Sequence, residues 1–231
     1  MKLPQQSERL RVWDLPTRLF HWSLAACVIG LVITGKVGGA AIEWHARLGQ
    51  TVLALLLFRL VWGLIGGHWS RFVHFVPGPG RVLRYLRGRG DTAQMVHNPL
   101  GALSVLAMLG VLLAQALSGM VSDDEIAFTG PWNRWVSSAF GLAATSYHRS
   151  IGQWALIALI VLHLGAIAWH QWRLRERLVQ AMLHGDKWVE APKSADASRP
   201  ASVDGWRNRL LAAWVFALSA GLVVLLATLA T

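Results

Sequence analysis

Residues 148–165 read HRSIGQWALIALIVLHLG, an apolar run that starts with one histidine and carries a second, His163, near its end. A helix needs about 20 mostly apolar residues to cross the hydrocarbon of a bilayer, and the run from Ile151 to Trp169 approaches that length. The two histidines are 15 residues apart, which is ~22 Å along a helix, with the side chains ~60° apart around its axis. The stretch therefore predicts a membrane-spanning helix with two histidines on roughly one face, at two depths.

The composition of the whole chain also indicates a membrane protein. Of its 231 residues, 54% are hydrophobic and 15% are charged, whereas soluble domains carry about 25% charged residues. The 13 tryptophans agree with this, because Trp is enriched at membrane–water interfaces. A formal charge of +10 alone would suggest nucleic acid, but so apolar a chain argues against such a partner. With one cysteine, Cys27, and no C-x-x-C-H motif, an intramolecular disulfide and a covalent c-type haem are excluded.

Four other segments are also long and apolar enough to be membrane-spanning helices. Together with the first, the predicted spans cover residues 19–35, 45–65, 100–120, 149–170 and 206–231. The second is the least clean of these runs, because the polar residues Arg47, Gln50 and Arg59 interrupt it. We therefore predict an all-α integral membrane fold, with a four-helix bundle in residues 1–185, a cytoplasmic linker over 186–205, and a fifth, C-terminal transmembrane helix.

The distribution of positive charge predicts the orientation of the chain. Lys and Arg residues in alternate connections sum to 17 on one side of the predicted spans and 3 on the other. Cytoplasmic connections carry the excess of Lys and Arg, so we expect the N-terminus inside and the C-terminus outside. The acidic cluster Asp123, Asp124 and Glu125 then falls on the outer side.

Four of the nine histidines are predicted to lie in the spans or at their ends, at two depths. His21 and His163 share the inner level, and His45 and His148 share the outer level. An ionisable group inside a span is a functional hypothesis by default, and the alternative for each is a histidine satisfied by a hydrogen bond or reaching water. Two pairs at two depths are what two stacked haems, each held by two histidines in a four-helix bundle, require.

Two glycines and one arginine are candidates to complete these haem sites. Gly49 and Gly152 follow His45 and His148 by one helical turn, where a missing side chain would let a flat macrocycle approach; small-residue helix packing is the alternative. Arg59 lies ~21 Å deeper than His45, and it would pair with a haem propionate unless it reaches the inner headgroups instead.

Two of the remaining histidines are weaker candidates. His170 follows His163 by seven residues and is the natural substitute if that ligand is misassigned. His97 starts the third span and could contact a quinone or a propionate, although a loop residue is the simpler interpretation.

Several motifs, in the right order, resemble one family. VWDLPTRLFHW at residues 12–22 resembles the N-terminal signature of bacterial cytochrome b561 and of the b-type cytochrome subunits of nickel–iron hydrogenases. RLVWG at 59–63 and HNPLG at 97–101 resemble the second helix and the entry to the third, and the two histidine motifs of residues 148–165 resemble the fourth. Many relatives have Glu after the histidine that starts the fourth helix, where this chain has Arg149.

The resemblance implies a di-haem electron carrier in the bacterial inner (plasma) membrane. Its non-covalent b-type haems would be held by His21 with His163 and by His45 with His148. It would exchange electrons between the quinone pool and a periplasmic partner, a c-type cytochrome or an oxidoreductase such as hydrogenase, as part of a respiratory chain. The chain would then be an electron-transfer protein or a subunit of an oxidoreductase complex, with no catalytic residue of its own.

Two other functions stay open on the residues alone. A transition-metal transporter could use the histidines as ligands, but almost no acidic residue lies inside a span to help carry a cation. A non-redox membrane anchor for a partner enzyme would leave the four histidines dispensable and the protein colourless. A nucleic-acid binder is a remote alternative, because the positive-inside distribution accounts for the arginines and no folded soluble domain presents them.

Overall fold

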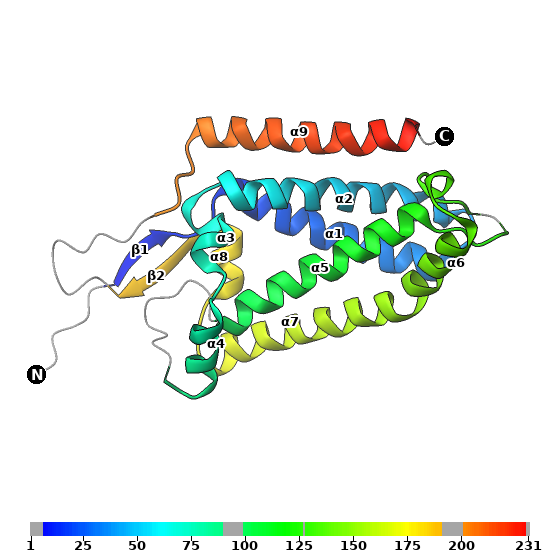
Figure 1. The fold of residues 1–231 in the computed structure, drawn as a ribbon. Coiled ribbons are helices and arrows are strands. Elements are labelled where there is room, and N and C mark those ends of the chain that lie inside the picture. Colours follow the sequence, from blue (N-terminus) through cyan, green and yellow to red (C-terminus); the bar gives the residue numbers. More distant parts are fainter. Residues whose placement is uncertain (1–6, 90–98, 127, 191–200, 230–231) are drawn as a thin grey trace, which may run out of the picture. The chain divides into compact units, whose positions relative to one another are not determined.

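The structure is a computed structural model, and it describes all residues except 1–6, 90–98, 127, 191–200 and 230–231. Five helices are long and apolar enough to cross a membrane, which confirms the predicted all-α integral membrane fold (Figure 1). They are α1 (Leu15–Val37), α2 (Ala41–Ile65), α5 (Pro99–Val121), the continuous helix Ser138–Arg173 and α9 (Trp206–Leu229). The fourth of them therefore begins at Ser138, whereas the span predicted from the sequence began at residue 149.

Shorter elements connect the long helices. The helical ones are η1 (His68–Ser70), α3 (Phe72–Phe75), α4 (Pro79–Leu86), η2 (Asn133–Trp135) and α8 (Leu178–His184). Strands β1 (Ser7–Arg11) and β2 (Asp186–Glu190) pair in an antiparallel ribbon with Arg9 opposite Trp188. This ribbon was not predicted from the sequence.

The turn between α1 and α2 depends on two glycines. Gly38 and Gly39 both have a positive φ, of 65° and 54°, which side chains other than glycine rarely adopt. The amide of Gly38 donates to the carbonyl of Thr34 and closes the last turn of α1. The two helices are therefore joined by a very short connection.

The chain forms two compact units, and each of the five long helices contributes residues to both of them. One unit, called here the ribbon unit, comprises residues 1–19, 61–103 and 164–212. The other, called here the span unit, comprises residues 20–60, 104–163 and 213–231.

Helix α2 is the centre of the span unit. Half of its most apolar stretch is buried, against 17% at most in the other four long helices. Leu53 and Ala54 pack with Met120 of α5 and Val223 of α9, and Val52 and Leu56 form a second cluster with Leu112. The span in which the sequence places Arg47, Gln50 and Arg59 is thus the most buried one. Arg59 is buried within it, whereas Arg47, near the start of α2, is exposed.

Helix α9 packs on α2 within the span unit. Val223 is only 2% exposed, and the ring of Phe216 lies edge-on to that of Phe58 with centroids 6.2 Å apart. The opposite face of α9 is open, since Trp214 and Leu218 are exposed. The fifth helix therefore contacts the bundle on one side and presents apolar side chains outward on the other.

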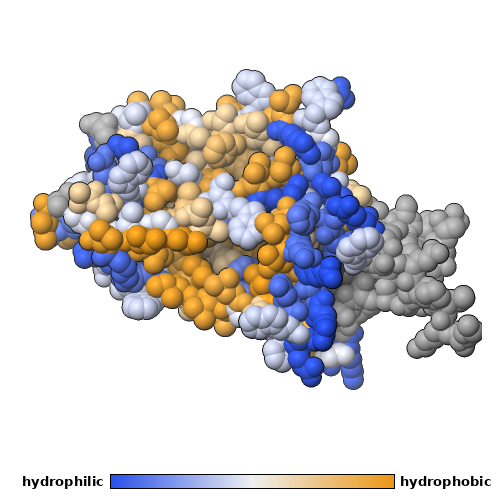
Figure 2. All heavy atoms as spheres, turned by 180° about the vertical axis from the view of Figure 1, so that it is seen from behind, coloured by the Kyte–Doolittle hydropathy of each residue, from blue (hydrophilic) through white to orange (hydrophobic). Residues whose placement is uncertain are grey.

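Large apolar side chains are exposed on the other long helices as well. Ile29, Trp154 and Leu162 are each more than 60% exposed, and Figure 2 shows a broad hydrophobic area bordered by hydrophilic residues. Soluble monomers rarely expose contiguous apolar surface on this scale. The chain is a multi-pass membrane protein, and lipid covers this surface.

The ribbon unit is organised around a buried carboxylate, that of Asp14. It is fully buried and caps α1 by accepting a hydrogen bond from the Thr17 amide at 2.9 Å. It also accepts hydrogen bonds from the indole Nε1 of Trp62, the Gly67 amide and the Ser70 hydroxyl, at 3.2, 3.1 and 2.9 Å. One side chain thereby joins the start of α1 to the end of α2 and to η1.

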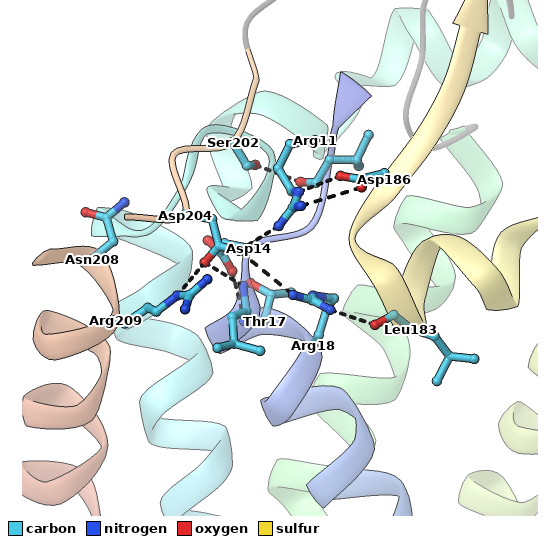
Figure 3. Close-up of polar contacts among 12 residues, drawn as sticks. Arg11, Asp14, Thr17, Arg18, Leu183, Asp186, Ser202, Asp204, Asn208 and Arg209 are labelled. Atoms are coloured by element: carbon cyan, nitrogen blue, oxygen red, sulfur yellow. Dashed lines mark hydrogen bonds and ion pairs between the residues drawn. The ribbon is translucent and has the colours of Figure 1, made fainter. Parts of the chain in front are cut away.

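A second carboxylate, that of Asp204, fastens the segment before α9 to the same helix start (Figure 3). Its Oδ1 accepts hydrogen bonds from the Leu15 amide and from Arg209 Nε, both at 3.2 Å. Its Oδ2 accepts from Arg11 Nη1 at 2.8 Å, with Arg18 at 3.8 Å. Burial raises the pKa of Asp204, but the contacts of Arg209, Leu15 and Arg11 outweigh this and hold it below 3.8.

Replacing Asp14 by Ala should destabilise the protein by about 2–4 kcal/mol, because several buried donors lose their acceptor at once. The midpoint of thermal unfolding in detergent would fall accordingly. Glu43→Ala is the matched control, since Glu43 makes an exposed i,i+4 ion pair with Arg47 that contributes less than about 1 kcal/mol. Equal midpoints for the two variants would show that Asp14 does not organise the unit.

The effect of Asp204→Asn on stability should depend on pH. A carboxylate whose folded-state pKa is lowered stabilises the fold above its unfolded pKa and loses that contribution as pH falls through the folded value. The variant should therefore unfold at a lower temperature than the wild type at pH 7, and the gap should close progressively below about pH 4. A gap that stays constant from pH 7 to pH 3 would contradict this assignment.

Candidate functional site

The outer histidine pair lies between α2 and the helix formed by residues 138–173. His45 is in the second turn of α2, and His148 is the first residue of a π-helical turn, η3 (His148–Gly152). Their ring centroids are 6.0 Å apart, and the ring planes are inclined by 80°. The structure thus brings together two residues that are separated by more than 100 positions in the sequence.

Hydrogen bonds fix the tautomer of both outer imidazoles. Nδ1 of His45 lies 3.1 Å from the carbonyl oxygen of Leu31, and Nδ1 of His148 lies 2.9 Å from that of Gln115. A carbonyl oxygen only accepts, so each Nδ1 carries the proton and donates it. Nε2 of each ring then keeps its lone pair, which is the arrangement found in metal-ligating histidines whose other nitrogen donates to a carbonyl.

The inner pair is formed by His21 of α1 and His163 of α7 (Gln153–Arg173). Their ring centroids are 6.5 Å apart, and the planes are inclined by 52°. Nδ1 of His21 is buried and has no hydrogen-bond partner among the described residues. Trp22 packs edge-on against the His21 ring with centroids 5.1 Å apart.

Both pairs have the spacing that one metal ion between two imidazoles needs. Bonds from a metal to an imidazole nitrogen are about 2 Å long, which puts the centres of two rings on opposite sides of one ion roughly 6 Å apart. The observed separations of 6.0 and 6.5 Å match this value. Together with the protonated Nδ1 atoms of the outer pair, this shows that the residues present fit a haem between each pair.

The π turn alters how His148 and His163 are related. A regular α-helix between them, as expected from the sequence, would place the two side chains ~60° apart. A π turn accommodates one extra residue, so the separation becomes ~40° in the opposite sense. The two histidines still lie on one face of the helix, and π turns of this kind are frequent at functional sites.

Gln115 supports the π turn and was not singled out as a site residue by the sequence analysis. The side-chain Nε2 of Gln115 donates to the backbone carbonyl of His148 at 3.1 Å. The backbone carbonyl of Gln115 in turn accepts a hydrogen bond from Nδ1 of His148. The available signal was a lone amide side chain inside an otherwise apolar span, because polar groups in spans are retained for a partner.

The glycines nearest to the imidazoles are not the two that the sequence suggested. A Cβ at Gly35 would lie 3.2 Å from Cε1 of His45, and one at Gly119 would lie 3.1 Å from Cε1 of His148. A Cβ at Gly152 would instead meet Oε1 of Gln115 at 2.0 Å, and one at Gly49 would meet nothing within 4 Å. Nothing in the spacing of Gly35 and Gly119 identified them, because their role depends on the neighbouring helices.

Arg59 and His170, two further candidates from the sequence, lie in different units of the protein. Arg59 is 4% exposed and lies within α2. Nδ1 of His170, in the ribbon unit, lies 3.7 Å from Oε1 of Glu176. His97 lies outside the described residues.

Comparisons with known proteins match most of the chain to one family. The family model described as prokaryotic cytochrome b561 matches residues 12–185. Similar proteins include the probable Ni/Fe-hydrogenase B-type cytochrome subunit of Bradyrhizobium diazoefficiens, 22% identical over 210 residues that cover 76% of this chain and 85% of that protein. The corresponding subunit of Azotobacter chroococcum is 24% identical, covering 75% and 86%, and that of hydrogenase 1 of Escherichia coli K12 is 22% identical, covering 66% and 80%. No solved structure matches the chain.

Single alanine substitutions should remove one haem from one pair at a time. His45→Ala and His148→Ala should each lower the haem content from two per chain to one, because an iron with one imidazole is weakly held. His21→Ala and His163→Ala should do the same for the other pair. His184→Ala, at an exposed histidine outside both pairs, is the control, and haem content by pyridine haemochrome is the measurement. Loss of a haem in His170→Ala but not in His163→Ala would contradict the inner pairing.

Proposed function

The chain belongs to the prokaryotic cytochrome b561 family, and we propose that it is a di-haem cytochrome that carries electrons between a periplasmic redox partner and the membrane quinone pool. Membership makes it a membrane b-type cytochrome of electron transfer. The number of haems and the identity of both partners are the parts that we propose.

The two histidine pairs are the observation that carries this proposal. A haem held by two neutral imidazoles moves single electrons and leaves no open coordination position for oxygen or substrate. His45 and His148 are oriented because each donates its Nδ1–H to a backbone carbonyl. The packed apolar side chains around α2 keep water away from the centre of the span unit. The role proposed for these residues is therefore to bind and orient the haems, and none of them needs to take part in a chemical step.

Arg59 is proposed to neutralise a carboxylate of the inner haem. A haem brings two propionates, and a buried guanidinium needs an anionic or hydrogen-bonding environment. The alternative, an arginine that reaches the headgroups, would leave the side chain exposed, whereas Arg59 is 4% exposed.

The periplasmic partner is proposed to meet the connection that follows α5. This connection carries Asp123, Asp124 and Glu125, and Glu125 adopts a positive φ of 57° in a tight loop. A negatively charged surface would attract the basic face of a c-type cytochrome or of another redox protein. The relatives named as hydrogenase cytochrome subunits make a hydrogenase the first partner to test. This proposal follows the orientation expected from the distribution of Lys and Arg. The N-terminus is then cytoplasmic, the C-terminus is periplasmic, and the membrane is the bacterial inner membrane.

The transporter alternative has little support from the described part of the chain. Within it, no group of three or more His, Cys, Asp or Glu side chains could hold a metal ion. The haem content of the protein tests the remaining alternative, a non-redox anchor.

The test is a dithionite-reduced minus oxidised optical spectrum of the purified protein, with haem and protein quantified. Two bis-histidine sites predict sharp b-type bands at about two haems per chain. One haem per chain would show that one pair is not a ligand set. A colourless protein from haem-replete cells would overturn the electron-transfer proposal and leave the anchor.

The quinone half of the proposal is tested on the same sample. A quinone added after removal of excess dithionite should restore the oxidised spectrum, whereas the matching quinol should leave the reduced protein unchanged. Failure of several quinones to oxidise a protein with full haem content would remove the quinone pool from the proposal without affecting the haem assignment.

A further inference from the structure

Helix α4 (Pro79–Leu86) is short and strongly amphipathic, and the function proposed above makes no use of it. At ~100° per residue, Val82, Leu83 and Leu86 fall on one side of the helix and Arg81 and Arg84 on the other. Arg87 follows at the C-cap. The segment thus combines an apolar face with a cluster of positive charge.

Neither face of α4 is fully covered by the residues that the structure describes, among which Val82 is half-buried. Leu83 is 48% exposed and Leu86 is 62% exposed. Arg81, Arg84 and Arg87 are also exposed, and none of them makes an ion pair with another residue that the structure describes. No Asp or Glu occurs anywhere between residues 66 and 89. Among the described residues the charge is therefore uncompensated, and the leucines need something apolar to cover them.

The position of α4 in the chain limits what can cover it. It lies in the connection between α2, which ends at Ile65, and α5, which starts at Pro99, and both helices are long and apolar enough to cross a membrane. Only 13 residues separate the end of α2 from the start of α4. The helix is therefore tethered close to a membrane surface.

We propose that α4 lies in the membrane surface and binds anionic phospholipid. Val82, Leu83 and Leu86 would dip into the boundary between headgroups and acyl chains, as basic amphipathic helices do. Arg81, Arg84 and Arg87 would then contact the lipid phosphates, which accept hydrogen bonds from a guanidinium in a bidentate way. An acidic protein would satisfy the arginines only, whereas an anionic lipid satisfies both faces of this helix. The proposal holds whether or not the protein binds two haems.

The first test measures lipid binding by the full-length protein in detergent. Native mass spectrometry would follow titration with phosphatidylglycerol and, separately, with zwitterionic phosphatidylcholine. Each basic residue near an anionic surface strengthens binding by a factor of about five. A triple variant that combines Arg81→Gln, Arg84→Gln and Arg87→Gln should therefore weaken phosphatidylglycerol binding roughly 100-fold. Binding of phosphatidylcholine should not change. The corresponding triple Lys variant keeps the charge and should retain most of the affinity.

A single-site comparison controls for general loss of charge. Arg84→Gln should weaken phosphatidylglycerol binding about fivefold. Arg134→Gln removes one exposed arginine from η2, outside α4, and should leave the binding as it is. Equal affinities for wild type and the triple Gln variant, or equal losses in the two single variants, would overturn the proposal.

The second test locates the apolar face of α4 in a bilayer. Nitroxide labels would be placed at Leu86→Cys or Arg84→Cys in a Cys27→Ser background, and the protein reconstituted in nanodiscs that contain phosphatidylglycerol. The label at 86 should be accessible to oxygen and protected from a water-soluble nickel chelate, and the label at 84 should show the reverse. Equal access of the chelate to both labels would show that α4 does not lie in the membrane surface.

Discussion

A polar group inside the hydrocarbon of a bilayer finds no water, so it must find its hydrogen-bond partner within the protein. The outer histidines of this cytochrome illustrate how that constraint shapes the whole centre of the span unit. His45 and His148 each direct one nitrogen to a backbone carbonyl, of Leu31 and of Gln115, and each turns its ring toward the other. The hydrogen bond that Nδ1 donates thereby orients Nε2, the ring nitrogen that would bind a metal.

Charged groups in the ribbon unit also need partners within the protein, because packing buries them away from water. Asp14 is fully buried and accepts four hydrogen bonds from three separate segments. Asp204 adds a bond to the first amide of α1 and ion pairs with Arg11 and Arg209. The start of α1, the helix that carries His21, is thus held by two carboxylates, one of them from the segment that leads into α9.

Helix α9 lies beyond residues 12–185, the part that matches the cytochrome b561 family. It is nevertheless part of the span unit, because Val223 and Phe216 pack on α2. The helix that holds His45 is therefore surrounded by partners on several sides, which explains why α2 tolerates polar residues such as Gln50 and Arg59 that lipid would not. In this chain, the helix that follows the matched region covers one side of α2.

Much of this organisation could be derived from the sequence because it depends on local properties. The length of an apolar run determines that it spans a membrane, and the helical repeat determines that His148 and His163 share a face at two depths. The five spans and the family motifs followed from such patterns. Other features depend on segments that are far apart in the chain. The π turn and its support by Gln115, the approach of Gly35 and Gly119 to the imidazoles, the β1–β2 ribbon and the Asp14 cluster appear only when the helices have packed. No periodicity encodes such contacts, since they are set by which side chains meet across the interfaces.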